Sequence, residues 1–206
     1  MTGRISRPDA AALGVRAHSG WAAYVVLSGD PKHPDIVARD RMTLCDAKIR
    51  GSKQPFHEAE PMTFAQAEQF ITRCCASTAA LAGKAIADIQ KSSPVSACCV
   101  LTASGRPLPD LKGILASHTL IHAAEGEFYR DAVAVACERR QIAVRRVRER
   151  DVEDELHKLP GAAVTAKERL VEFGKRVGPP WTQDEKMAAI GAWLMLALLP
   201  TRRRQS

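Results

Sequence analysis

Two histidines and a glutamate share one face of a predicted helix. His118, His122 and Glu125 stand at positions i, i+4 and i+7, which keeps their side chains within a sector of about 60°. Two imidazoles and a carboxylate are ligands that suit zinc or another transition metal. One helix seldom completes such a site, and Asp184 or His18 are the candidates for the missing ligand. The alternative is a half-buried helix flank on which Glu125 bonds a neighbouring side chain.

Five cationic side chains are candidates for binding an anion such as phosphate. Arg16 and His18 precede a Ser-Gly turn, and Arg106 follows an apolar strand in a loop of the kind where α/β sheets bind ligands. Arg146 and Arg148 would project from the same face of a strand. The alternative for these last two arginines is an edge strand whose charges are solvated or ion-paired.

The hydrophobic pattern predicts an antiparallel start followed by β-α-β units. The segment 13–28 is rich in β-forming residues, with an upstream half that can pair with its downstream half, while 48–60 is irregular with at most a short edge strand. Capping boxes at Thr63 and Thr182 begin two of the helices. The remaining strands are expected at 36–44, 95–102 and 142–148, and the helices at 63–90, 114–140, 151–157, 165–177 and 182–199. This order predicts an α/β sandwich with a mixed sheet.

Three segments carry a resemblance to a known family. Residues 14–27 resemble a first strand, 116–152 a helix with the following strand and turn, and 184–196 a final alanine-rich helix with acids at its start. Together they resemble the ribonuclease H-like superfamily of the Holliday-junction resolvase type, within an uncharacterised bacterial group. The resemblance implies a three-layer sandwich around a mixed five-stranded sheet of order 3-2-1-4-5, with helices on both faces. It implies one domain over 11–200, between a flexible arm at 1–10 and a basic tail at 201–206.

The chemistry of that superfamily needs carboxylates that converge on two divalent ions. By the resemblance, the first-strand aspartate would fall near Arg16, and the central-strand acid would fall within 98–103, which contains none. Only the last helix offers candidates, Asp184 and Glu185. We therefore expect a binding module for an anionic ligand or nucleic acid that lacks the standard two-metal nuclease site. The alternative is a metal-dependent hydrolase or nuclease with a rebuilt His/Glu/Asp site, so catalysis stays open, and a purely structural protein is a third alternative.

Charge and motifs narrow the function further. The 206-residue chain has a net charge of +7, but five of its arginines lie in the two terminal segments, which leaves +2 for residues 9–199. The terminal arginines can add salt-sensitive attraction to polyanions. The sequence has no P-loop, no G-x-G-x-x-G and no G-x-S-x-G, so nucleotide-kinase, dinucleotide-dehydrogenase and hydrolase-elbow functions lack support.

Cysteine usage and hydropathy predict a cytoplasmic protein. The six cysteines form no C-x-x-C pattern, which favours reduced thiols. The apolar run 187–200 is shorter than the roughly 20 residues of a membrane span, so we expect a buried helix there and no membrane partner. That helix, with Trp181 and Trp193, could also pack against a second copy, which makes a homo-oligomer a candidate assembly.

Overall fold

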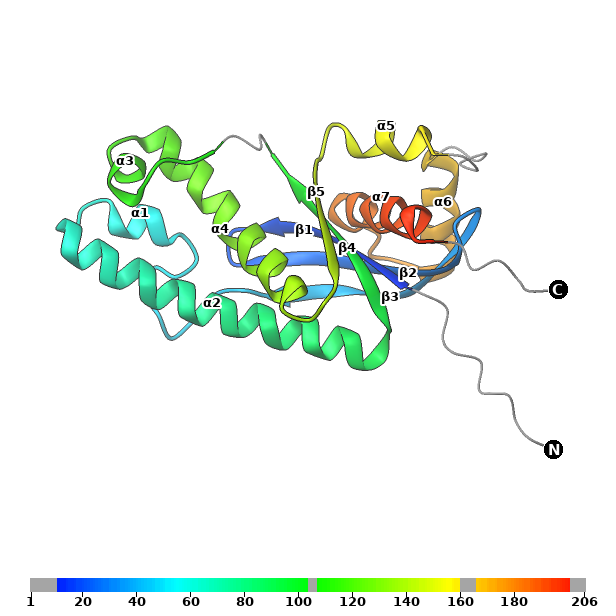
Figure 1. The fold of residues 1–206 in the computed structure, drawn as a ribbon, viewed down its shortest axis with the longest axis horizontal. Helices are drawn as coiled ribbons and strands as arrows, with labels where there is room; N and C mark the ends of the chain where they lie inside the picture. Colours follow the sequence, from blue (N-terminus) through cyan, green and yellow to red (C-terminus); the bar gives the residue numbers. More distant parts are fainter. Residues whose placement is uncertain (1–10, 104–106, 160–165, 201–206) are drawn as a thin grey trace.

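A mixed five-stranded sheet forms the centre of the molecule (Figure 1). The computed structural model describes residues 11–103, 107–159 and 166–200. The strands are β1 (Ala11–His18), β2 (Trp21–Asp30), β3 (His33–Thr43), β4 (Val95–Thr102) and β5 (Ala143–Arg148). Their order is β3-β2-β1-β4-β5, with antiparallel pairing of β1 with β2 and of β2 with β3, and parallel pairing of β1 with β4 and of β4 with β5. The predicted order 3-2-1-4-5 is confirmed.

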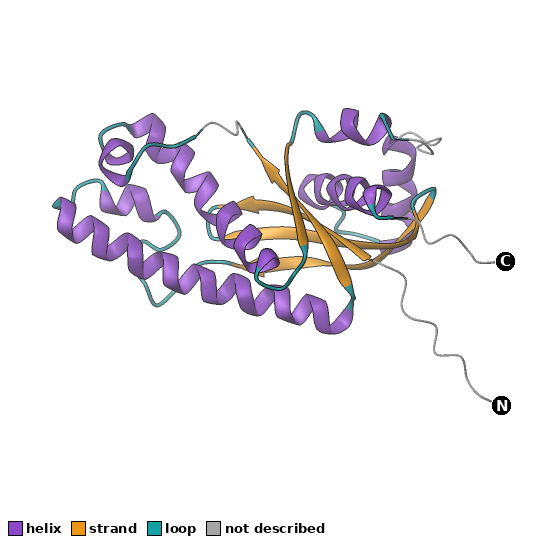
Figure 2. Cartoon of the chain, viewed as in Figure 1, coloured by secondary structure: helices purple, strands orange, loops and turns teal. Residues whose placement is uncertain are grey.

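Helices lie on both faces of this sheet (Figure 2). They are α1 (Pro55–Ala59), α2 (Phe64–Ser92), α3 (Leu111–Leu115), α4 (His118–Glu138), α5 (Val152–His157), α6 (Ala166–Val177) and α7 (Gln183–Leu198). The long helices α2 and α4 bury Ile86 and Val133 in one cluster with Leu13 of β1 and Val100 of β4. Beyond the sheet, α1 and α3 pack with α2 and α4 around a separate apolar cluster that includes Phe56, and Figure 1 shows α1 and α3 at the left of the molecule.

Helix α7 crosses the other face of the sheet in very close contact with β1. A Cβ atom on Gly14 would lie 1.8 Å from the carbonyl oxygen of Ala188, so only glycine fits at this crossing. Helices α5 and α6 join α7 in the same core, where Phe173 of α6 and Trp193 of α7 are buried. The apolar run is thus a core helix, as predicted, and no helix in the described part of the chain has the length and hydropathy to cross a membrane.

Three local predictions need correction. The segment 13–28 divides into two strands around Ser19 and Gly20, where Gly20 has a φ of 85° that glycine adopts without strain. The segment 48–60 contains the short helix α1 rather than an edge strand, because Pro55 starts a helical turn and Phe56 is buried. The helix expected at 114–140 is two helices, α3 and α4, separated at Ser117.

The cysteines of the structure are all free thiols. Cys74, Cys98, Cys99 and Cys137 are buried, whereas Cys75 is exposed and Cys45 is intermediate. Burial raises the pKa of Cys74 to about 11 and that of Cys99 to about 12, which disfavours the reactive thiolate at both positions. The predicted arm 1–10 and basic tail 201–206 lie outside the described residues.

Candidate functional site

Arg16 is held between two carboxylates at one end of the sheet. Its side chain projects from β1, and its Nε and Nη2 atoms donate to the two oxygens of Glu149 at 3.1 and 2.8 Å. Its Nη1 atom donates to Oδ1 of Asp184 in the first turn of α7. Glu149 directly follows β5, and its backbone N–H donates to the carbonyl of Thr102 at the end of β4 at 3.0 Å. Three elements distant in sequence therefore converge on one guanidinium.

His18 extends this cluster toward the next strand. Its Nε2 atom lies 2.9 Å from the Asp184 oxygen that also binds Arg16. Its ring stacks on Trp21 of β2 with a centroid distance of 4.5 Å and an interplanar angle of 18°. The guanidinium of Arg41, from β3 on the other side of β2, lies 4.3 Å from the centre of the same indole. We call His18, Trp21 and Arg41 the aromatic row.

The charges of this cluster stabilise one another. Burial raises the pKa of Asp184, but hydrogen bonds and charge interactions with His18 and Arg16 outweigh it, and the net pKa lies below the usual range of an aspartate. The hydrogen bond to Glu149 is the largest influence that raises the pKa of Arg16, and it outweighs the opposing effect of burial. The side chains of Arg16, Glu149 and Asp184 are 22%, 28% and 19% exposed, so water screens them only in part.

This arrangement does not fit the two-magnesium centre that the sequence resemblance implies. A divalent pair requires hard oxygen ligands around an open position. Here the two oxygens of Glu149 and one oxygen of Asp184 converge on a side chain that is itself a permanent cation. The strand β4, which would supply a central acid, contains none. The guanidinium of Arg16 thus provides the positive charge that compensates these carboxylates.

The predicted His118, His122 and Glu125 set lies elsewhere and has a different third histidine. His118 and His122, at the start of α4, meet His57 of α1, and one ligand atom of each lies within 4.8 Å of the others. Asp184 and His18 belong to the Arg16 cluster instead, so the prediction that either would complete this set is wrong. The reason is topological, because α1 and the start of α4 lie outside the sheet whereas α7 crosses it (Figure 1).

Glu125 supports His57. Its Oε1 atom accepts hydrogen bonds from the backbone N–H groups of Phe56 at 2.8 Å and His57 at 3.1 Å, and it lies 3.1 Å from Nδ1 of the His57 ring. Burial raises the pKa of Glu125 and outweighs the opposing hydrogen bonds from His57 and Phe56. The sequence left two roles open for Glu125, a metal ligand or a partner of a neighbouring side chain. The structure shows the second role, because Glu125 contacts His57.

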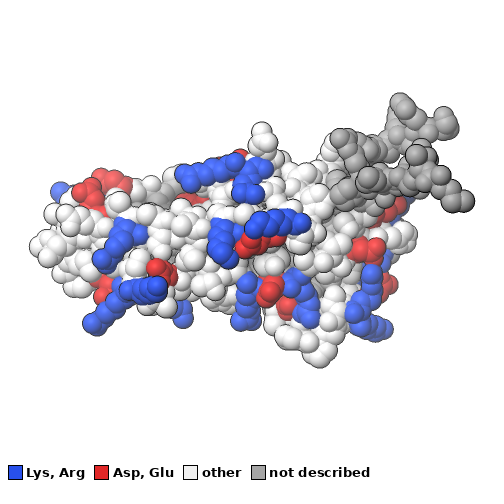
Figure 3. Space-filling model, turned by 90° about the horizontal axis from the view of Figure 1, so that it is seen from below, with Lys and Arg blue, Asp and Glu red and all other residues white. Residues whose placement is uncertain are grey.

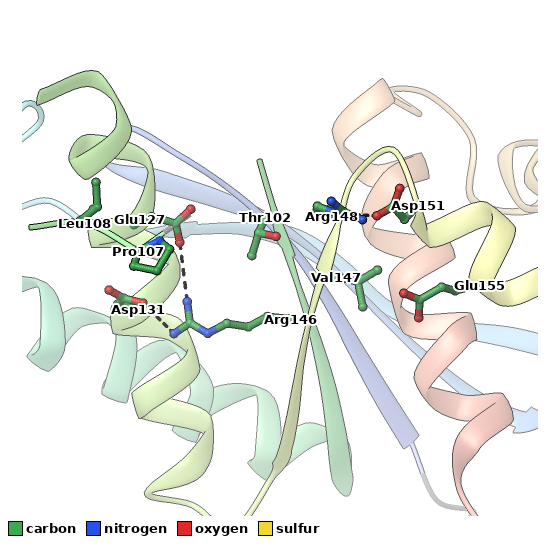
Figure 4. A pocket seen from close by; sticks show the side chains of 10 residues that line it. All are labelled: Thr102, Pro107, Leu108, Glu127, Asp131, Arg146, Val147, Arg148, Asp151 and Glu155. Atoms are coloured by element: carbon green, nitrogen blue, oxygen red, sulfur yellow. Dashed lines mark hydrogen bonds and ion pairs between the residues drawn. The ribbon is translucent and has the colours of Figure 1, made fainter. Parts of the chain in front are cut away.

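Arg146 and Arg148 line a cleft of about 570 Å³ beside β5, drawn in Figure 4. Arg146 pairs with Asp131 at 2.7 Å and with Glu127 at 3.7 Å, both from α4, while Arg148 pairs with Asp151. The lining holds four carboxylates and only these two arginines. Because the acids are in excess, the alternative of ion-paired edge-strand arginines describes this cleft better than an anion site. Arg106, the remaining anion candidate, lies outside the described residues.

Sequence reasoning missed two partners that the structure supplies. One is Glu149, which directly follows β5 and binds Arg16 from 133 residues away along the chain. His57 lies in the segment taken as irregular, although the Pro55-Phe56 pair before it indicates a helix start with a buried side chain.

Comparisons with known proteins agree with this architecture. No protein-family model matches the chain, and no curated protein matches it. RuvC from T. thermophilus, solved in complex with Holliday junction substrate, superposes with a TM-score of 0.53 and 11% identity over 89% of this chain and 90% of that one. The chain has the ribonuclease H-like fold of RuvC. A further Thermus thermophilus RuvC structure gives a TM-score of 0.50 and 11% identity over 89% and 91% of the two chains. The resemblance inferred from sequence is thus confirmed for the fold. At 11% identity the comparison shows the fold alone.

Proposed function

We propose that this chain is a ribonuclease H-like binding module that holds nucleic acid and does not cut it with a pair of divalent ions. The observation that carries the proposal is the position of Arg16. By the resemblance, this residue stands where the first-strand aspartate would fall, and its guanidinium takes up three carboxylate oxygens of Glu149 and Asp184. A metal ion entering here would have to displace a salt bridge and would then meet the charge of Arg16.

Nucleic acid is the anionic ligand that the residues around Arg16 favour. The aromatic row lies next to Arg16, and its Arg41 is exposed at the surface of the sheet. Aromatic rings flanked by cations are the chemistry by which proteins hold single-stranded or unpaired bases and their phosphates. An exposed arginine can exchange its ring contact for a phosphate without uncovering a buried group. The RuvC structure in complex with Holliday junction substrate also supports a nucleic-acid ligand for this scaffold.

The charge distribution sets the expected strength of binding. On the face seen in Figure 3, Lys and Arg side chains are scattered among Asp and Glu side chains and form no continuous basic surface. Because residues 9–199 also carry a net charge of only +2, affinity should be moderate and should rest on few phosphate contacts, with a shallow dependence on salt.

Fluorescence anisotropy with labelled branched, duplex and single-stranded DNA and RNA tests the proposal over a salt series. The wild type should bind at low salt, and Arg41→Ala should weaken binding and lower the salt slope by about one, as expected for the loss of one phosphate contact. Lys175→Ala removes an equal charge from the exposed side of α6 and should leave the affinity nearly unchanged.

Two results would overturn this function. One is the absence of binding to every nucleic acid at low salt, which would favour a structural or interaction protein. The other is magnesium-dependent cleavage of a branched or hybrid substrate by the wild type that Asp184→Asn abolishes, since such activity requires a working carboxylate site beside Arg16.

A further inference from the structure

Half of the histidines in this chain gather at one place. The sequence contains six histidines, and the rings of His57, His118 and His122 lie against one another with centroid distances of 4.6 to 5.4 Å. His57 comes from α1 and the other two from successive turns of α4. His57 is half-buried, whereas His118 and His122 face solvent. The cluster therefore has one anchored member and an open outer side.

Carboxylates lie beside the Nδ1 atoms of two of these rings. Nδ1 of His57 lies 3.1 Å from Oε1 of Glu125, and Nδ1 of His118 lies 3.7 Å from Oε1 of Glu60. A carboxylate hydrogen-bonded to one ring nitrogen, as Glu125 is to His57, fixes the orientation and tautomer of a histidine and leaves the other nitrogen, Nε2, as a basic ligand. This is the arrangement by which proteins commonly support metal-binding histidines.

The Glu125 carboxylate gives an independent sign that a cation is expected here. Its side chain is only 5% exposed. Oε1 makes the hydrogen bonds to Phe56 and His57, while Oε2 is buried and has no hydrogen-bond partner among the described residues. A buried anion with one unsatisfied oxygen is costly unless a nearby positive charge compensates it. In the described part of the chain, the groups that bond this carboxylate are two backbone amides and one imidazole.

We propose that His57, His118 and His122 bind one transition-metal ion of the zinc class, with Glu125 as the positioning residue behind His57. Three imidazoles suit zinc, cobalt, nickel or copper and disfavour magnesium and calcium, which prefer oxygen. Three protein ligands with an open fourth position also match the ligand number of accessible zinc sites. The fourth position faces solvent, where water or the Glu60 carboxylate can fill it.

The spacing is close to what such a site requires. With metal–nitrogen bonds of about 2.0–2.1 Å, tetrahedral ligands lie roughly 3.3 Å apart. The ligand atoms here are within 4.8 Å of one another, so the site closes if the rings of His118 and His122 turn toward His57. Both residues are exposed and are free to make that adjustment, while His57 stays fixed by Glu125.

This site is separate from the Arg16 cluster and does not depend on the proposed function. The two groups share no residue and lie on different elements, one on α1 and α4 and the other on β1, α7 and the turn after β5. A bound ion would join α1 to α4, two helices separated by 58 residues of the chain.

Binding of zinc and cobalt to the full chain, purified without a histidine tag, tests the proposal. Calorimetry should show one zinc per chain and no response to magnesium. Single substitutions His57→Ala, His118→Ala and His122→Ala should each lower zinc affinity about tenfold or more, whereas His157→Ala on the exposed side of α5 should not. Cobalt should give visible absorption of a tetrahedral nitrogen site without the charge-transfer bands of a thiolate, which separates the histidines from the free cysteines.

Glu125→Gln tests the positioning role, since it keeps the shape of the side chain and removes its charge. It should lower zinc affinity about 10–100-fold. A purely structural role would change the thermal midpoint of the metal-free protein but not the further rise that zinc produces, so both quantities are measured. The proposal is overturned if the wild type shows no zinc binding in the micromolar range, if the three histidine variants bind as tightly as His157→Ala, or if the cobalt spectrum shows thiolate ligands.

Discussion

Replacing Arg16 with methionine should destabilise the fold through the carboxylates that remain. Removing one member of a buried ion pair typically costs about 3–5 kcal/mol, because the other member is left as an uncompensated charge. Here Arg16, Glu149 and Asp184 are between 19% and 28% exposed, so water relieves part of that penalty. We expect a loss of about 2 kcal/mol in the free energy of unfolding at neutral pH, between the buried and the surface limits.

The loss should depend on pH in a defined direction. In the wild type, His18 and Arg16 hold the pKa of Asp184 below its usual value despite the opposing effect of burial. Its contribution is therefore present at neutral pH and is lost as the pH falls through that lowered pKa. In Arg16→Met the folded-state pKa of Asp184 should rise toward or above the unfolded value. The stability difference between the two proteins should be largest near neutrality and shrink in acid, where the carboxyl groups are protonated in both.

Urea unfolding followed by circular dichroism, at neutral and at acidic pH, measures both effects. Adding Glu149→Gln to Arg16→Met should restore part of the stability, because it removes one of the two stranded charges. Arg176→Met is the matched control: Arg176 pairs with Asp35 at 2.8 Å, but both side chains are 57% exposed, so the expected change is within about 0.5 kcal/mol. A variant at Arg16 as stable as this control at all pH values would refute the view that its guanidinium balances the two acids.

Three further predictions concern the same scaffold. The thermal midpoint of Arg16→Asp should rise with added magnesium at constant ionic strength, whereas that of the wild type should not, because a third acid then replaces the cation. Equal shifts of the two midpoints with magnesium would contradict this prediction. Gly14→Ala should lower the free energy of unfolding by about 2 kcal/mol or more, because its Cβ meets the backbone of α7, whereas Gly83→Ala, where a Cβ has open space inside α2, should raise it by about 0.5–1 kcal/mol. Tyr129→Phe should cost about 1–3 kcal/mol in the same urea assay, since its buried hydroxyl donates to the carbonyl of Ser52 at 2.5 Å, and a neutral result would mean that this contact contributes nothing.

The sheet could be predicted because its signals are local and repeated. The uninterrupted apolar run of β4 indicates a strand buried on both faces, and β4 is an interior strand of the sheet, between β1 and β5. The capping box at Thr182 marks the start of α7 to within one residue. Once strands and helices alternate, the handedness and connection rules leave few orders for the sheet.

The two polar clusters could be predicted only in part, because each is completed by a residue far away in the chain. The helical period places His118 and His122 together, but nothing periodic identifies His57, which lies in a helix of five residues. Likewise, Arg16 and His18 could be singled out from the turn that follows β1, whereas the acids that bind them come from the ends of other elements. Periodicity describes one element at a time, and these contacts arise between elements.

The two clusters predict opposite responses to metals, and this contrast makes them separable in one protein. At the sheet, the positive charge belongs to the side chain of Arg16. Adding magnesium, which prefers oxygen ligands, should therefore leave the stability unchanged unless Arg16 is replaced. At the helices, the imidazoles of His57 and His122 offer nitrogen to a softer ion and are unaffected by the substitution at Arg16. Zinc should therefore stabilise the wild type and Arg16→Asp alike, while magnesium stabilises only the latter. If zinc instead stabilised the protein by binding at the Arg16 cluster, substitution of His122 would leave the zinc-dependent stabilisation unchanged. That result would contradict the view that the two sites bind metals independently.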